Sequence, residues 1–234
     1  MRGISQKQNG NGRGHTNAAW AAAGAGGAVY AVLAVLVRGQ QTDPLDVTGV
    51  RLVHPLVSTA ADVLFKTLTF LMSGAGLGMF AALALLAFFV RSSLRAGAVR
   101  VGVAMGGGEA IVDGLKLLSH RTRPTTAGNG LNYSFPSGHA FFAMAVYGLI
   151  ALLIGRHLAH KNRRGPFAVY TFAFVLIFLT GVSRVYLGFH YASDVVGGWA
   201  AGLVWLLICH LSGMSATPTH AKVAEVGTTD IDEH

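Results

Sequence analysis

The sequence contains few charged residues and a single cysteine. Only 12% of its 234 residues are charged and 52% are hydrophobic, whereas a soluble domain carries about 25% charged residues. Cys209 has no second cysteine to pair with, which excludes an intrachain disulfide and a cysteine metal cluster. The composition therefore favours a membrane protein, and the chain is long enough for several spans of about 20 residues each.

Acidic residues are scarcer than basic ones, and the net charge is +8. On a soluble chain this excess would suggest nucleic acid as a partner. Here the cations lie mostly in short clusters between apolar runs, so orientation in the membrane and attraction to anionic lipid explain them better. We expect the lipid bilayer as a partner and no nucleic acid.

Apolar runs predict an all-α, polytopic membrane helix bundle with six transmembrane helices. Charged residues interrupt the third run, which makes it the least regular. An extra interfacial helix is expected at Val57–Met72, between the first and second spans, although this stretch could instead begin a long second span. The expected spans are Asn17–Val37, Gly74–Val90, Ala96–Leu117, Ala140–Ile154, Pro166–Val182 and Val195–Leu211.

Six spans place both termini on one side, together with most of the basic loop residues. The positive-inside rule predicts that this side is cytoplasmic in the cell membrane. Residues 1–16 and 212–234 are expected to be disordered cytoplasmic tails around a six-span domain at 17–211. Three polar segments then share the outer, extracytoplasmic face, and they are Lys116–Pro124, Phe135–His139 and Ser183–Asp194.

The first of these segments holds several cations. Lys116 and Arg123 bracket the end of the third span, Arg121 lies between them, and Pro124 stops the helix. An ammonium and a planar guanidinium suit the oxygens of a phosphate. Cations that extend from a span end toward water are the alternative explanation.

The second segment reads Pro-Ser-Gly-His. Pro136 suits a first helical turn, Ser137 can donate a hydrogen bond, and Gly138 allows a backbone amide to approach an anion at the helix N-terminus. His139 would stand beside the bound anion. A solvated histidine near a helix end is the alternative.

The third segment places His190 and Asp194 four residues apart, on one face if the sixth helix has begun. The carboxylate could then accept the ring N–H and leave the other nitrogen as a nucleophile. Ser183 and Arg184 would complete the shell of the anion. A capping aspartate beside an incidental histidine is the alternative.

Together the three segments resemble the signature motifs of the phosphatidic acid phosphatase type 2 superfamily, which includes lipid phosphate phosphatases and vanadium haloperoxidases. The motifs are K-x6-R-P, P-S-G-H and S-R-x5-H-x3-D, and every signature position matches. The resemblance covers Lys116 to Asp194, about a third of the chain. It implies a phosphatase that needs no metal or other cofactor and works through a phosphohistidine.

The resemblance also implies a role for each site residue. His190 attacks phosphorus, Asp194 orients His190, and His139 protonates the leaving oxygen. The remaining residues hold the phosphate oxygens, namely Lys116, Arg123, Ser137, Gly138 and Arg184. From their positions in the same segments, we add Arg121 and Ser183 as auxiliary members.

One further residue follows from helical spacing alone. Asp113 lies three residues before Lys116 and would share its helix face. We expect Asp113 to pair with Lys116 or a neighbouring cation and to support the phosphate site, unless this helix end is simply hydrated.

The expected substrate is a phosphomonoester or diphosphate of a membrane lipid. Polyprenyl diphosphates such as undecaprenyl diphosphate, phosphatidylglycerol phosphate and phosphatidic acid all carry phosphate at headgroup depth, and the motifs do not distinguish them. An anion channel or transporter using the same cations is the alternative function. A vanadium haloperoxidase is a third possibility, which six spans argue against.

Overall fold

The computed structural model describes residues 2–71, scattered helical positions between 76 and 90, and residues 95–124, 133–159 and 164–212. Every regular element in these ranges is helical, which confirms the all-α prediction for them. The tail at 213–234 lies outside the described residues.

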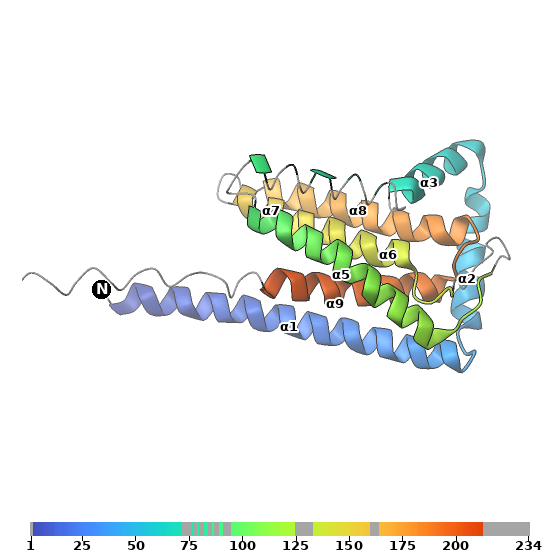
Figure 1. Ribbon diagram of the computed structural model, residues 1–234, viewed down its shortest axis with the longest axis horizontal. Coiled ribbons are helices and arrows are strands. Elements are labelled where there is room, and N and C mark those ends of the chain that lie inside the picture. Colours follow the sequence, from blue (N-terminus) through green and yellow to red (C-terminus); the bar gives the residue numbers. More distant parts are fainter. Residues whose placement is uncertain are drawn as a thin grey trace, which may run out of the picture.

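Long helices form the body of the protein (Figure 1). Three short elements, α6, η3 and α7, run on without a break, and η3 is a π-helical turn within this continuous helix. The bounds are α1 Arg2–Arg38, α2 Asp43–Val53, η1 His54–Leu56, α3 Thr59–Leu71, α5 Arg95–Ser119, α6 Gly138–Phe142, η3 Ala143–Tyr147, α7 Gly148–Ala159, α8 Gly165–Tyr186 and α9 Ala192–Ser212.

Four helical stretches are long and apolar enough to cross a membrane, and they are Thr16–Arg38, Gly138–Ala159, Gly165–Tyr186 and Ala192–Ser212. They coincide with the first, fourth, fifth and sixth predicted spans. Helix α5 covers the third predicted span with 25 residues, which makes it about 37 Å long. The second predicted span, Gly74–Val90, lies largely outside the described residues.

The segment after α1 differs from the prediction. A helix is present where the interfacial helix was expected, as α3, but α2 was not anticipated. Pro44 stands in its first turn, where the missing N–H costs nothing. Helix α1 itself begins at Arg2, within the expected disordered tail. Once an apolar helix has formed, each added residue gains one hydrogen bond without a new nucleation step, so the helix can extend into a polar sequence.

Helix α9 lies at the centre of the packing, beside α1 along its length (Figure 1). Two glycines four residues apart, Gly198 and Gly202, allow the α6 backbone to approach closely. A Cβ atom on Gly202 would lie 2.5 Å from the carbonyl oxygen of Phe141. Small residues at this spacing are typical of tightly packed membrane helices. The start of α6 is therefore fixed against α9.

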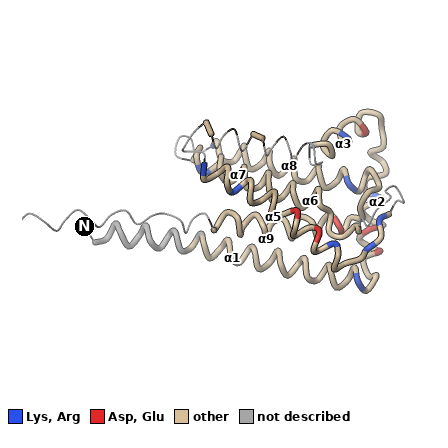
Figure 2. The backbone as a smooth tube through the Cα atoms, viewed as in Figure 1, with Lys and Arg blue, Asp and Glu red and all other residues tan. Residues whose placement is uncertain are grey.

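The polar segments predicted to meet do lie at one end of the bundle. The ends of α1, α5 and α8 and the starts of α6 and α9 gather there beside α2 (Figure 1). The described acidic residues lie toward this end, whereas lysines and arginines occur at both ends (Figure 2). The opposite end holds the start of α5 and the end of α7.

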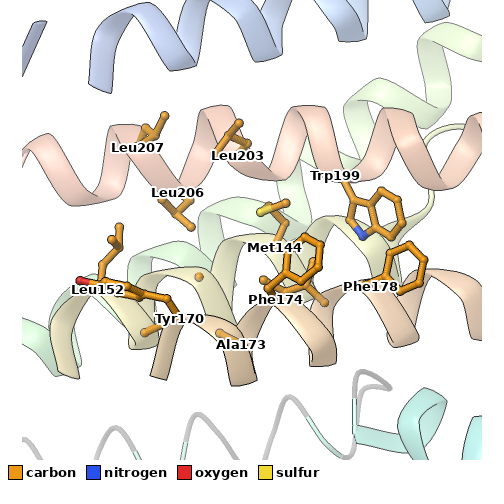
Figure 3. A pocket seen from close by; sticks show the side chains of 13 residues that line it. Met144, Leu152, Tyr170, Ala173, Phe174, Phe178, Trp199, Leu203, Leu206 and Leu207 are labelled. Atoms are coloured by element: carbon orange, nitrogen blue, oxygen red, sulfur yellow. The ribbon is translucent and has the colours of Figure 1, made fainter. Parts of the chain in front are cut away.

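An apolar pocket of about 340 Å³ opens between α7, α8 and α9. Met144, Phe174 and Trp199 are among the side chains around it (Figure 3). Its lining has no charged side chain, so it offers no cation that could bind a phosphate. The chemistry predicted from the motifs therefore has to lie elsewhere, at the polar end of the bundle.

Candidate active site

The turn between α8 and α9 positions His190. Gly188 has a φ of 68°, in the left-handed region that glycine adopts without strain. The chain reverses there, and the His190 N–H donates to the carbonyl oxygen of Arg184 at 3.2 Å. Only 3% of His190 is exposed. The turn thus buries the imidazole beside the end of α8.

Asp194 contacts His190 across the start of helix α9. The helix begins at Ala192, so His190 precedes it and the condition for a shared helical face is not met. Instead, Asp194 reaches back over the helix start, as an acidic residue does in a capping box. Its Oδ2 accepts the Tyr191 N–H at 3.0 Å and lies 3.4 Å from His190 Nδ1.

The other ring nitrogen of His190, Nε2, faces the cationic side chains of the site. Nε2 of His190 lies 3.5 Å from an NH1 nitrogen of Arg123. Burial lowers the pKa of His190 from its ordinary value of 6.5, although Asp194 acts in the opposite direction. The imidazole is therefore neutral at neutral pH, and with its proton on Nδ1 it presents a lone pair on Nε2.

The Pro-Ser-Gly-His segment is held directly against α9. The Ser137 N–H donates to the carbonyl oxygen of Asp194 at 3.0 Å. Gly198 makes this approach possible, because a Cβ there would lie 2.5 Å from the Ser137 carbonyl oxygen. Lys116 joins from α5, since a Cβ placed on Gly138 would lie 3.8 Å from its Nζ. The first two signature segments therefore meet the third.

Basic side chains from several segments converge on His139. Arg184, His190, Lys116 and Arg123 all lie close enough to act on it electrostatically. Two buried donors from the signature motifs have no hydrogen-bond partner in the described part of the chain, Ser137 Oγ and Arg184 Nε. Buried donors are normally paired, so this arrangement is suited to an anion that supplies several acceptor oxygens.

Arg184 and Ser183 are linked through α3. Arg184 NH1 donates to Thr69 Oγ1 at 3.1 Å, and Ser183 Oγ lies 3.1 Å from the same atom. Ser183 Oγ also donates to the carbonyl oxygen of Thr180 at 2.6 Å. The Ser183 hydroxyl is therefore engaged by protein groups, which favours a supporting role over direct contact with phosphate.

Arg121 is fully engaged as well. Its NH1 donates to Ser193 Oγ and Asp194 Oδ1, both at 2.7 Å. Its NH2 donates to Asp46 Oδ2 at 2.6 Å and to Thr42 Oγ1 at 3.0 Å. Both terminal nitrogens are thus directed at protein acceptors. This geometry does not match the auxiliary phosphate contact expected from the sequence.

Asp113 is exposed on α5. It lies close enough to Lys116 to act on it electrostatically, but among the described residues no ion pair within 4 Å joins the two. The described residues contain no group of three or more histidine, cysteine or acidic side chains arranged to hold a metal ion.

Sequence reasoning missed three residues that support the site: Thr42, Asp46 and Thr69. Their segment carries no signature motif. The position of Asp46 in the first turn of a short helix normally indicates only a favourable interaction with the helix dipole. A buried acid such as this one becomes recognisable only when its partners are known.

Comparisons with known proteins point to one family. The sequence model of the PAP2 superfamily matches residues 97–217. Phosphatidylglycerophosphatase B of Bacillus subtilis is 41% identical over 92 residues, which are 38% of this chain and 45% of that protein. The chain thus matches less than half the length of this relative.

Two solved structures share the fold. The first is described as the first transmembrane PAP2 type phosphatidylglycerolphosphate phosphatase from Bacillus subtilis, with a TM-score of 0.73 and 23% identity over 85% of this chain and 98% of that one. The second is Aquifex aeolicus LpxE, with a TM-score of 0.53 and 24% identity over 73% of this chain and 95% of that one. The matched segment of the family covers half of the chain and contains all three signature motifs, and the chain belongs to the PAP2 superfamily.

Proposed function

We propose that the protein is a membrane lipid phosphatase that works through a phosphohistidine at His190. The observation that carries this proposal is the setting of that side chain. Asp194 lies against one ring nitrogen, and Arg123 lies 3.5 Å from the other. A site that only binds or conducts anions has no need of a carboxylate that orients an imidazole, whereas a nucleophilic histidine does.

In the first step Nε2 of neutral His190 attacks phosphorus, and the N–P bond forms as the P–O bond to the lipid breaks. Asp194 accepts the Nδ1 proton in a hydrogen bond and stabilises the positive charge that develops on the ring. His139 gives a proton to the departing oxygen. The leaving group from a monoester substrate is a lipid alcohol, and the leaving group from a diphosphate substrate is a lipid monophosphate.

In the second step a water molecule attacks the phosphohistidine. His139, now neutral, takes a proton from the water, and the electron pair of the N–P bond returns to Nε2. Inorganic phosphate is the product. Throughout both steps the negative charge on the equatorial oxygens is stabilised by fixed donors, which are Lys116, Arg123, Arg184, Ser137 Oγ and the Gly138 amide.

We assign no metal to this reaction, because three cationic side chains would repel a divalent ion. The name of the Bacillus relative makes phosphatidylglycerol phosphate the first substrate to test, followed by phosphatidic acid and a polyprenyl diphosphate. We further propose six spans in the plasma membrane, with α3 at the interface, the termini in the cytoplasm and the site outside. The start of α1 and the end of α9 lie at the end of the bundle opposite the site, which supports placing the termini and the site on opposite sides of the membrane (Figure 1).

Phosphate release by the purified protein in detergent tests the proposal. We expect release from at least one of the three lipids, inhibition by orthovanadate and no effect of a chelator. His190→Ala should release no phosphate while its melting temperature stays unchanged. His157→Ala is the matched control, because this exposed histidine lies near the end of α7, at the other end of the bundle. Substantial release by His190→Ala would remove the nucleophile assignment, and transport of anions without hydrolysis would favour a channel.

A further inference from the structure

A buried carboxylate on α2 lies behind the two residues assigned to nucleophilic catalysis. Asp46 is 5% exposed. One of its oxygens, Oδ2, lies 2.6 Å from Arg121 NH2, and the other, Oδ1, accepts the Ser193 N–H at 2.9 Å. The carboxylate therefore contacts both the guanidinium that binds Asp194 and the backbone from which Asp194 projects.

The contact with Ser193 provides a cap from a different helix. The N–H groups in the first turn of α9 have no acceptor within their own helix. Asp46 satisfies one of them, and its negative charge also interacts favourably with the positive end of the helix dipole. Close packing supports this contact, because a Cβ on Gly49 would lie 2.5 Å from the Cβ of Ala192. Helix α2 is thus seated directly on the start of α9.

Arg121 connects the two carboxylates. Each of its terminal nitrogens donates to one of them, Asp46 or Asp194, at 2.6–2.7 Å. Its guanidinium carbon also lies 4.0 Å from the centre of the Tyr191 ring. A planar guanidinium held at several points has a fixed orientation. Because its side chain is 14% exposed and Asp194 is fully buried, water contributes little to this arrangement.

We propose that Asp46 is a positioning residue of the active site, which holds Arg121 against Asp194 and so fixes the carboxylate that orients His190. This inference rests on the proposed function of His190. It gives α2, a helix without any signature motif, a defined part in the reaction. It also reassigns Arg121 from the phosphate shell to the support of Asp194.

The charge balance leads to a measurable consequence. Two carboxylates share one guanidinium, so the group formed by Asp46, Arg121 and Asp194 carries a net negative charge, which partly offsets the cations near His190. The charged or titratable groups that face His190 are Asp194 on α9, Arg123 after α5, Arg184 on α8 and His139 on α6. Replacing Asp46 by the neutral asparagine leaves Arg121 to neutralise Asp194 alone. The imidazolium form of His190 loses stabilisation, and its pKa should move further down.

Asp46→Asn tests the proposal, with Asp43→Asn as the matched control. Asp43 lies one turn earlier on α2 and is exposed. We expect Asp46→Asn to reduce kcat by about 10- to 100-fold, as expected for a misplaced catalytic group, with little change in KM. The titration of His190, followed by NMR in histidine-labelled protein and assigned with His190→Ala, should move to lower pH. Asp43→Asn should change neither quantity.

A folded Asp46→Asn variant with wild-type kcat and an unchanged His190 titration would overturn the proposal, as would equal losses in Asp43→Asn. The titration needs no substrate, so it also decides the matter if the proposed lipid phosphatase activity is absent. If Asp46→Asn does not fold, Arg121→Lys keeps the charge but loses the two-sided contact. A lower kcat at unchanged KM would then support the positioning role. A raised KM at unchanged kcat would place Arg121 on the phosphate and overturn it.

Discussion

Replacing Gly198 by alanine adds a single methyl group and should impair catalysis. The added Cβ would lie 2.5 Å from the carbonyl oxygen of Ser137 and 2.9 Å from the Cβ of Ala140. Favourable contacts between carbon atoms begin near about 3.5 Å. The start of α6 must therefore move away from α9 by roughly 0.5–1 Å to relieve contacts of this kind.

This movement separates the groups assigned to the two halves of the reaction. Helix α6 carries His139, and α9 carries Asp194, the partner of His190. The hydrogen bond from the Ser137 N–H to the carbonyl oxygen of Asp194 joins the two helices at this point. A displacement of about 1 Å can reduce turnover by about 10²-fold. Overpacking of this kind also costs about 1–3 kcal/mol of stability. We therefore expect a large loss of kcat together with a modest fall in melting temperature.

The assay is lipid phosphate release in detergent, combined with a thermal unfolding curve for each variant. Gly106→Ala is the matched control, because no heavy atom lies within 4 Å of a Cβ at that position. An alanine there should raise helix stability slightly, by up to about 1 kcal/mol, and leave turnover unchanged. Wild-type turnover in Gly198→Ala would refute the reasoning, because the α6–α9 contact would then not set the catalytic geometry.

Two further predictions concern the surroundings of His190. Thr69→Val removes the acceptor of Arg184 NH1 and should raise KM by about tenfold or more, since a lost hydrogen bond to a charged group is worth about 1.5–3 kcal/mol and about 1.4 kcal/mol corresponds to a factor of ten. Thr67→Val on the same helix is its control, because the hydroxyl of this exposed residue donates to the carbonyl oxygen of Val63 within α3. The second prediction is a pH profile. Because burial lowers the pKa of His190, the neutral nucleophile persists below pH 6.5, and the acid limb of kcat/KM should lie below that value. An acid limb above pH 6.5 would contradict the neutral, buried state of this imidazole, provided that the limb persists when each of the other histidines is replaced.

The signature residues could be located from the sequence because two kinds of regularity agree. The alternating direction of the spans predicts which segments share an end of the bundle, and the motif spacing indicates which residues within them carry the chemistry. Lys116, Gly138 and His190 therefore meet as expected. The partnership of His190 with Asp194 was also predicted, although His190 lies just before the helix, which begins at Ala192.

The supporting residues could not be located in this way. Arg121 and Arg123 are two residues apart and chemically identical, and no local pattern indicates that one of them binds two buried carboxylates. Asp46 belongs to an 11-residue helix that opens with a proline, and its partners are remote in sequence. Such roles depend on tertiary contacts, which a single sequence does not encode in any periodic pattern.

Helix α9 explains why a site assembled from remote segments can be held rigidly. Asp194, Gly198 and Gly202 follow one another at intervals of four residues and so lie along one face. The first residue carries the chemistry, and the two glycines set how closely α6 approaches. Because one helical face fixes both the carboxylate and the segment that carries His139, their separation is determined by backbone packing and not by flexible side chains. Asp46 and Arg121 then fix the remaining freedom of the carboxylate from the side of α2.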